Sequence, residues 1–432
     1  MLLASCPLLG SSYRVTKTEY LLREMRSRLW VKPAIMSLAA VLWVSFAYFG
    51  AFLLPEDMRV VVKREILINL LGIMASTMLT VATFSVAAMV SAYSAVSTTA
   101  TPRATRIVMQ DRSSQNSLTS FLAAFIYAII ALVAISIVEY GAGGRVLLFA
   151  GYSGVLIWVL ISFVRWVDRV SKLGRMGDTL ERVEESCRET FSSPETMGTL
   201  GAKTADDSPV TGARITADII GYVQNIDVAE LNEIAGELGT SIRVMERPGA
   251  FVDPHDALVT VLNHPNLEEE MITRIRNTFQ LGDSRRVSSD PRFGMILLSE
   301  IADRALSPAV NDPGTAIVVL GIQVRLMEMW SQHHNKEEKI KYEHIEVPPL
   351  SAEDLLDDAF TAISRDGAGI FEVGARIQKS LAVLGRLSGG IFASAARRHS
   401  RLALEQAELS LVTDDHKKIV RQLAEQVGNP AN

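Results

Sequence analysis

Hydroxyl side chains recur at steps of three or four residues along the apolar segment 69–101. The positions are Ser76, Thr80, Thr83, Ser91, Ser94, Thr98 and Thr101, with Ala87 in the one intervening place. On a helix this spacing puts them on one face. A Ser or Thr hydroxyl bonds to its own backbone, to a neighbouring helix or to water. The stripe therefore has two interpretations, a packing seam between helices or the wall of a hydrated path.

A hydrated path requires several copies of this helix around a symmetry axis. Rings of hydroxyls then line the path, and apolar residues close it by excluding water. Met89 and Val90, beside Ala87, are the candidates for such a gate. The packing interpretation requires only that small residues let two helices approach closely.

Arginines follow the stripe directly. Pro102 ends or kinks the helix because it lacks a backbone donor, and Arg103 and Arg106 come next. In a ring of copies they place positive charge at the cytoplasmic mouth, which attracts anions and repels cations. The alternative role is to bind lipid phosphates and set the topology.

A second polar cluster lies in the C-terminal half. Arg285 and Arg286 precede a helical pattern, and Asn311 and Asp312 precede Pro313. Two guanidinium groups near a helix N-terminus are able to bind a small anion. Asp312 is also a good helix cap, with Pro313 at the first helical position. We predict that Arg285, Arg286, Asn311 and Asp312 mainly hold the fold together, and the ligand site is the alternative.

Four apolar runs reach the length of about 20 residues that crosses a hydrocarbon core. They are residues 34–54, 69–96, 118–138 and 146–166. Basic residues gather before the first run, between the second and third, and after the fourth. The positive-inside rule therefore predicts a multi-pass protein of the bacterial inner (cytoplasmic) membrane with both termini in the cytosol. No charged side chain lies in the interior of the runs, which argues against a proton-coupled transporter.

The chain divides by composition as well. Basic residues outnumber acidic ones up to residue 175, and acidic ones outnumber basic ones after it, which indicates an acidic, soluble half. We expect a basic segment at 1–33, a four-span domain at 34–167, a linker helix and loop at 168–213, a small α+β domain at 214–288 and a mainly helical domain at 289–432. In the last domain we expect a loop at 331–349 and helices at 352–388, 391–409 and 414–427.

Composition and motifs exclude several functions. The 432 residues carry a net charge of −5 and only two cysteines, Cys6 and Cys187, which cannot form a metal quartet and fit a reduced cytosol. A phosphate-binding Gly loop, a dinucleotide fingerprint, a zinc-protease motif and a nucleophile elbow are missing. We expect no enzymatic activity, no metal, no cofactor and no nucleic-acid partner.

A resemblance to a known family rests on two segments, FSVAAMVSAYSAVSTTATPRATRIVMQDRSSQNSLTSFLAAFIYAI and EIADRALSPAVNDPGTA. Further marks are Pro102-Arg103, Asp111, Phe121, Tyr127, Gly221-Tyr222-Val223-Gln224, Pro248-Gly249, Phe251, Ser307-Pro308-Ala309 and Asn311-Asp312-Pro313. With these residues the chain resembles a bacterial family of predicted membrane proteins, domain of unknown function 2254. The resemblance implies a multi-span N-terminal domain and a cytosolic domain, and it implies no activity.

The predicted fold is a membrane α-helical domain of four transmembrane helices joined to a cytosolic α+β domain, with a small β unit and a C-terminal helical bundle. The leading hypothesis is a homo-oligomeric ion channel or channel-like pore, lined by the second apolar run and modulated by the cytosolic domain. Its partners are then the lipid bilayer, further copies of the chain and ions. The alternative is a membrane-anchored interaction or sensory protein without conduction, and a membrane-bound enzyme comes third.

Overall fold

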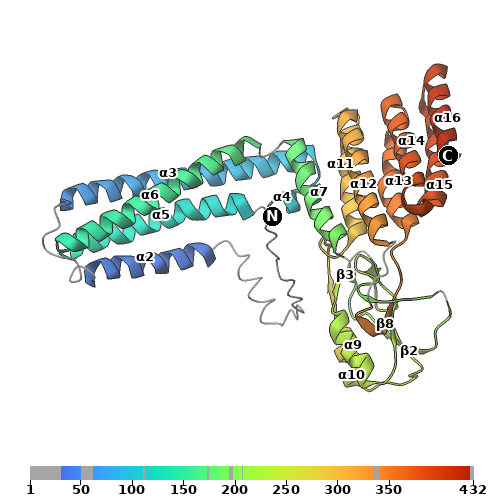
Figure 1. Cartoon of the computed structure of the whole chain (residues 1–432), viewed down its shortest axis with the longest axis horizontal. Helices are drawn as coiled ribbons and strands as arrows, with labels where there is room; N and C mark the ends of the chain where they lie inside the picture. The colour runs from blue at the N-terminus through green and yellow to red at the C-terminus, as the bar shows by residue number, and fades with distance from the viewer. Residues whose placement is uncertain are drawn as a thin grey trace, which may run out of the picture. The chain divides into compact units, whose positions relative to one another are not determined.

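The computed structural model describes residues 31–49, 62–109, 112–172, 175–193, 198–206, 208–334 and 340–428. The chain forms two compact units (Figure 1). Unit 1 comprises residues 1–92 and 111–173, and unit 2 comprises residues 93–110 and 174–432. Most of the basic segment predicted at 1–33 lies outside the described residues.

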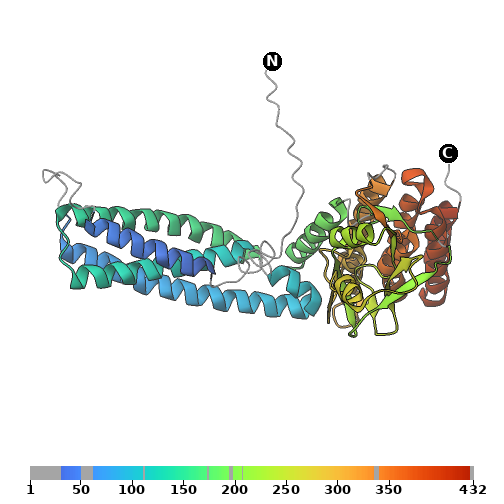
Figure 2. The same ribbon diagram turned by 90° about the horizontal axis from the view of Figure 1, so that it is seen from below.

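Unit 1 is a bundle of helices. They are α2 (Val31–Phe49), α3 (Arg64–Thr99), α5 (Arg112–Ile137) and α6 (Ala142–Lys172). Two views at right angles show them side by side (Figures 1 and 2). Helix α3 belongs to unit 1 as far as Ala92, and its last residues belong to unit 2.

Helices α3, α5 and α6 are long and apolar enough to cross a membrane, by length and composition. The prediction of a multi-span helical region is thereby confirmed. Four spans are not confirmed, because within the described residues α2 is a shorter apolar helix and residues 50–54 lie outside them. The 36 residues of α3 span about 54 Å, which exceeds a hydrocarbon core of about 30 Å. Part of α3 therefore extends beyond the apolar layer.

Close approaches hold the helices of unit 1 together. The Tyr140 hydroxyl donates to the Val44 carbonyl of α2 at 3.3 Å. A Cβ on Gly151 of α6 would lie only 2.2 Å from Trp43 Nε1 on α2. These two helices pack this closely because residue 151 is glycine, as is common where membrane helices meet.

Unit 2 contains two sheets. The first has the order β1-β8-β4-β6-β2, and the second has the order β5-β3-β7. The strands are β1 (Ala202–Thr204), β2 (Gly212–Thr216), β3 (Gly221–Ile226), β4 (Ile242–Val244), β5 (Phe251–Val252), β6 (Ala257–Leu262), β7 (Phe279–Gly282) and β8 (Tyr342–Val347). The α+β character predicted for this region is thus present.

The loop predicted at 331–349 is wrong in part, because residues 342–347 form strand β8. Ile345 and Val347 are buried, and β8 pairs in parallel with β1 and β4. Six residues between a charged stretch and two prolines are a weak strand signal, and pairing with remote strands decides the conformation. The first sheet therefore recruits β1 and β8 from outside the segment 214–288, which had been expected to form the small α+β domain alone.

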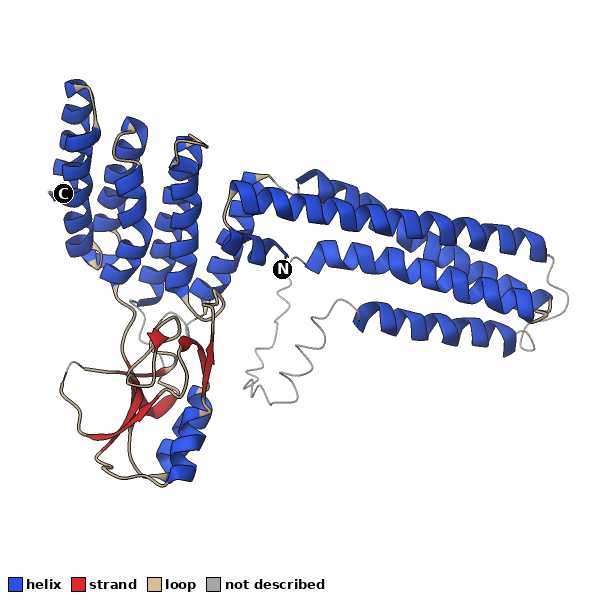
Figure 3. Ribbon diagram, turned by 180° about the vertical axis from the view of Figure 1, so that it is seen from behind, coloured by secondary structure: helices blue, strands red, loops and turns tan. Residues whose placement is uncertain are grey.

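The helices of unit 2 are α4 (Pro102–Met109), α7 (Met176–Ser192), α9 (Val228–Glu237), α10 (Glu269–Arg276), α11 (Pro291–Leu306), α12 (Pro313–His334), α13 (Ala352–Asp366), α14 (Phe371–Arg386), η2 (Ser388–Gly390), α15 (Ala393–Ser410) and α16 (Asp414–Gly428). They lie apart from its strands, except α9 and α10, which pack against the first sheet (Figure 3). The helix predicted at 352–388 is wrong as a single element. It is broken between α13 and α14, where Gly367 lies so close to Val373 that an added Cβ would be 2.4 Å from Cγ1.

The core of unit 2 includes the end of α3. Its largest fully buried side chains among the described residues are Trp330, Phe191, Phe360 and Phe392. Val96 of α3 and Ala104 of α4 belong to the same cluster of buried residues. The last turns of α3 and all of α4 are therefore part of the packed structure of unit 2.

Candidate functional site

The predicted stripe forms an exposed face of α3. Its members are Ser76, Thr80, Thr83, Ala87, Ser91, Ser94 and Thr98, which we call the hydroxyl face, and all are exposed. The buried residues of α3, among them Leu67, Leu71 and Ser85, lie on the opposite side of the helix by the periodicity of 3.6. The hydroxyl face is therefore not a packing seam within the single chain.

The threonine hydroxyls of this face bond to their own helix. Thr80 Oγ1 donates to the Ser76 carbonyl at 2.9 Å, and Thr83 Oγ1 donates to the Leu79 carbonyl at 2.8 Å. Each hydroxyl has thereby used its one donor and keeps acceptor lone pairs that point outward. The face is a weakly polar surface that bears no charge.

Two predictions along α3 need correction. Met89 is buried, so it cannot form an apolar gate on the exposed face together with Val90. Thr101, the last member of the predicted stripe, is also buried, and its Oγ1 accepts from the Ala104 backbone N–H at 3.1 Å. Thr101 therefore caps α4. Ser94 and Thr98 remain exposed but belong to unit 2, so the part of the face in unit 1 ends at Ser91.

Arg103 and Arg106 of α4 make contacts inside unit 2. Arg103 forms an ion pair with Glu300 of α11. Arg106 Nη1 donates to Ser284 Oγ at 3.2 Å. The charged ring at a cytoplasmic mouth stays a prediction, and the single chain has these two side chains beside α11 and the loop 283–290.

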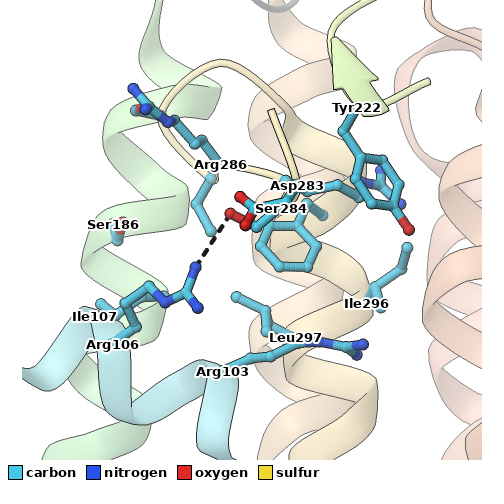
Figure 4. A pocket seen from close by; sticks show the side chains of 14 residues that line it. Arg103, Arg106, Ile107, Ser186, Tyr222, Asp283, Ser284, Arg286, Ile296 and Leu297 are labelled. Carbon is cyan, nitrogen blue, oxygen red and sulfur yellow. Dashed lines mark hydrogen bonds between the residues drawn. The ribbon is translucent and has the colours of Figure 1, made fainter. Parts of the chain in front are cut away.

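These arginines line a cavity of about 670 Å³ in unit 2, which we call the arginine pocket (Figure 4). Arg285 and Arg286 line it as well, so the pocket unites residues that are about 180 positions apart in the sequence. Helices α4, α7 and α11, Tyr222 of β3 and the loop 283–290 frame it. Figure 4 shows Arg106 reaching from α4 toward Ser284, with Tyr222 on the side away from Ser186.

Buried polar groups fix the loop 283–290. Gln224 of β3 is buried and donates from Nε2 to the Ser284 carbonyl at 2.7 Å. Ser289 Oγ donates to the Gln224 carbonyl at 2.5 Å, and Thr190 Oγ1 of α7 donates to the Val287 carbonyl at 2.8 Å. Three anchors along one short loop hold its backbone in place.

Asp290 connects this loop to α11. Its carboxylate accepts from the Phe293 backbone N–H at 3.1 Å and from Arg285 Nε at 2.7 Å. The chain passes so close here that a Cβ on Gly249 would lie 2.3 Å from Asp290 Oδ2, and Gly249 has a φ of +100°. Only glycine fits this turn without strain. Helix capping and the ion pair to Arg285 are thus provided by one buried carboxylate.

Asn311 and Asp312 lie away from the arginine pocket. Asp312 Oδ1 accepts from the Thr315 backbone N–H at 3.1 Å, and Asp312 Oδ2 accepts from Thr315 Oγ1 at 2.6 Å. Asp312 therefore caps α12, as its sequence context indicated. Asn311 adopts a φ of +49° in the turn before it. The four residues considered together in the sequence separate into a pocket-lining pair and a capping segment.

The carboxyl of Asp303 on α11 titrates near neutral pH. Burial raises the pKa of its carboxyl to about 7, and the negative charges of Asp366 and Glu300 act in the same direction. Its Oδ1 is buried and has no hydrogen-bond partner among the described residues. No group of three or more His, Cys, Asp or Glu side chains suited to a metal ion occurs in the described part of the chain.

The sequence indicated the arginines that line the pocket but not the residues that anchor its walls. Gln224 and Gly249 were noted as marks of a family, without a structural role. The side chain of Ser284 gave no signal, because its hydroxyl meets Arg106 from about 180 positions earlier in the chain. The ion pair of Glu300 has a partner that is equally remote in the sequence. Gln224 lies in a segment with the pattern of a strand, and a glutamine at such a position, once buried, needs hydrogen-bond partners. This was the signal in the sequence for a polar anchor.

Comparison with known proteins gives relatives without an assigned activity. An uncharacterized protein of Mycobacterium bovis and one of Mycobacterium tuberculosis are each 26% identical over 285 residues, which cover 62% of this chain and 51% of theirs. The chain thus spans about half the length of the curated relatives it matches. No solved structure matches it. A family model described as "Predicted membrane protein (DUF2254)" matches residues 26–383, so the chain belongs to this family of predicted membrane proteins of unknown function.

Proposed function

We propose that the protein is a homo-oligomeric, channel-like pore of the bacterial inner membrane, lined by the hydroxyl face of α3 and modulated by unit 2. Both termini lie in the cytosol in this arrangement. The observation that carries the proposal is the complete exposure of the hydroxyl face, opposite the side that α3 buries. A face that is unused within the chain is free to line a path between copies.

The flanks of the hydroxyl face support an assembly of copies. Leu79, Val86 and Val90 on one side and Phe84 on the other are exposed. When α3 helices surround an axis, the hydroxyl face turns inward and these apolar flanks are able to pack copy against copy. The threonine hydroxyls already donate their protons to backbone carbonyls, so their outward-pointing oxygens then offer lone pairs to a passing cation or to water.

The end of α3 provides the link to unit 2. Arg304 Nε of α11 donates to the Thr98 carbonyl at 2.7 Å, and Val96 is buried in the core of unit 2. A change in unit 2 that moves α11 must therefore displace the last turn of α3. This mechanical continuity supports modulation of the pore by the cytosolic part of the chain.

A second candidate is a membrane-anchored sensory protein without conduction. The bonds from Thr80 and Thr83 to their own helix favour it, because such hydroxyls need neither water nor a neighbouring helix. In either case we propose that the protein is not an enzyme. The arginine pocket then serves recognition alone.

Ion flux into liposomes tests the pore. The variant Thr80→Val, Thr83→Val, Ser91→Ala should assemble normally and conduct less, because it removes hydroxyls while nearly keeping the side-chain volume. Thr77→Val is the matched control. Thr77 is exposed on α3 and donates to the Ile73 carbonyl at 2.7 Å, yet it lies off the hydroxyl face.

Assembled wild-type protein that passes no ion under voltage, membrane tension or added ligand would overturn the pore in favour of the sensory alternative. A triple variant with the flux of the wild type would exclude the hydroxyl face as its lining.

Orientation has a separate test. In a variant with Cys6 and Cys187 replaced by alanine, a cysteine at Gly143 should react with an impermeant reagent from outside the cell. A cysteine at Ser208 should not react. The opposite pattern would place unit 2 on the other side of the membrane.

A further inference from the structure

The four arginines of the arginine pocket differ in how their charge is balanced. Arg285 is paired with the buried Asp290, and Arg103 is paired with Glu300. Among the described residues, the hydrogen-bond partner of the Arg106 side chain is a neutral hydroxyl, that of Ser284. Within the described part of the chain, neither Arg106 nor Arg286 has an ion pair. Arg106 therefore turns toward the cavity, and the exposed Arg286 extends along its rim, away from Arg106 in Figure 4, and both charges lack an ion pair among the described residues.

The remaining lining suits an anion that also has an organic part. Ser186 and Ser288 add hydroxyl donors, and the half-buried rings of Tyr222 and Phe293 add aromatic wall. A guanidinium binds two phosphate oxygens at once through its planar fork. The volume of about 670 Å³ falls in the range of small-molecule sites, about 300–1,000 Å³.

We propose that the arginine pocket binds an organic phosphate, whose phosphate oxygens are held by Arg106 and Arg286 and whose flat or apolar part rests against Tyr222 and Phe293. The anchors of the loop 283–290 hold its backbone, so binding requires little ordering of the loop backbone. Among the described residues, Asp283 is the one carboxylate that lines the pocket, and it opposes the anion.

Occupancy of this site is coupled to α3. Arg106 lies on α4, which is separated from the end of α3 by two residues. A phosphate that bridges Arg106 to Arg286 ties α4 to the loop 283–290 and restrains the last turn of α3. This regulatory step rests on the proposed pore, whereas the binding step is independent of it.

The phosphate has two possible sources, a soluble nucleotide-sized metabolite or the headgroup of an anionic phospholipid. Binding is measured by calorimetry on the full chain in nanodiscs of phosphatidylcholine, with ADP and inorganic pyrophosphate as soluble probes. Nanodiscs that contain phosphatidylglycerol provide the lipid arm. If the headgroup is the natural occupant, phosphatidylglycerol should weaken the binding of ADP in the wild type.

We expect ADP to bind the wild type, and we expect Arg106→Ala and Arg286→Ala to weaken it by about tenfold or more, since each removes a charged hydrogen bond. Arg106→Lys should restore part of the affinity, and Asp283→Asn should increase it. Arg401→Ala is the matched control, because Arg401 is an exposed arginine of unit 2 outside the pocket. Thermal unfolding of each variant reports that the fold is intact.

Absence of ADP and pyrophosphate binding in phosphatidylcholine, together with no effect of Arg106→Ala or Arg286→Ala on phosphatidylglycerol binding, would overturn the proposal. Equal affinity of the wild type and both alanine variants for ADP would overturn it as well. Binding without ion flux would leave the site standing and remove the pore. Flux without binding would do the reverse.

Discussion

The hydroxyl face of α3 and the arginine pocket are both polar, but they balance their polar groups in opposite ways. On the hydroxyl face, Thr80 and Thr83 donate to their own helix within four residues. Around the pocket, polar groups are paired across remote segments of the chain, as when Gln224 donates to the Ser284 carbonyl. Arg285 and Arg103 are paired with carboxylates, whereas Arg106 and Arg286 have no ion pair among the described residues. Because the hydroxyl face forms its hydrogen bonds within its own helix, it leaves a surface without charge that suits packing or conduction. Because two arginines of the pocket are left without an ion pair, the pocket suits the binding of a charged ligand.

Removing the carboxylate that organises the pocket should have the largest effect on stability. Asp290→Ala deletes the cap of α11 and leaves Arg285 without its partner in a buried place. We expect a loss of about 3 kcal/mol in the free energy of unfolding, measured by denaturant unfolding followed through tryptophan fluorescence. Gly249→Ala should also lose stability, because a Cβ at its φ of +100° is strained and would collide with the Asp290 carboxylate, whereas Gly236→Ala in α9, where an added Cβ meets only His344 at 4.0 Å, should not. Equal stability of all three variants would contradict this account of the pocket.

The pH dependence of stability tests the electrostatics beside the pocket. The pKa of Asp303 is about 7 in the folded protein against an ordinary value of 3.8, so the folded state holds a proton that the unfolded state releases between these pH values. Its contribution therefore becomes unfavourable as pH rises from about 4 to about 7. Asp303→Asn should be more stable than the wild type by about 1 kcal/mol at pH 8, a value discounted for partial exposure. The difference should vanish below pH 4, and a difference independent of pH would refute the assignment.

A capping residue outside the pocket sharpens the comparison. Asp312→Ala should cost about 1 kcal/mol through the lost cap of α12 and leave ADP binding unchanged, because Asp312 does not line the pocket. Unfolding and calorimetry on the same preparation separate the two readouts. If binding were lost while stability stayed the same, Asp312 would belong to the ligand site.

The hydroxyl face should give the smallest change in the stability of the single chain. Thr80→Val removes an exposed, intrahelical bond, and we expect a change within about 0.5 kcal/mol. If the face instead forms hydrogen bonds between copies, the oligomer should weaken by about 0.6 kcal/mol per lost bond. Unfolding of the monomer in detergent and oligomer size in lipid distinguish these cases.

Periodicity and caps made much of the fold predictable. The apolar runs that became α3, α5 and α6 follow from length and hydropathy, and Asp312 before Pro313 marked the start of α12. The two errors have different causes. The strand β8 exists through pairing with β1 and β4, which a local window of sequence does not show. The break at Gly367 depends on the close approach of Val373, only six residues later, so its partner is local and it is the three-dimensional contact that the sequence pattern does not reveal.

The sequence by itself determined that this chain has apolar helices long enough for a membrane, a periodic row of hydroxyls and arginines after Pro102. These properties depend on residues within a few turns of one another. Only the tertiary structure decided that the hydroxyl face is exposed while Met89 and Thr101 are buried, and that Arg106 meets Ser284 in one pocket. The reason is physical: burial and ion pairing depend on which distant segments pack together, and that choice is made by the whole core rather than by any local pattern.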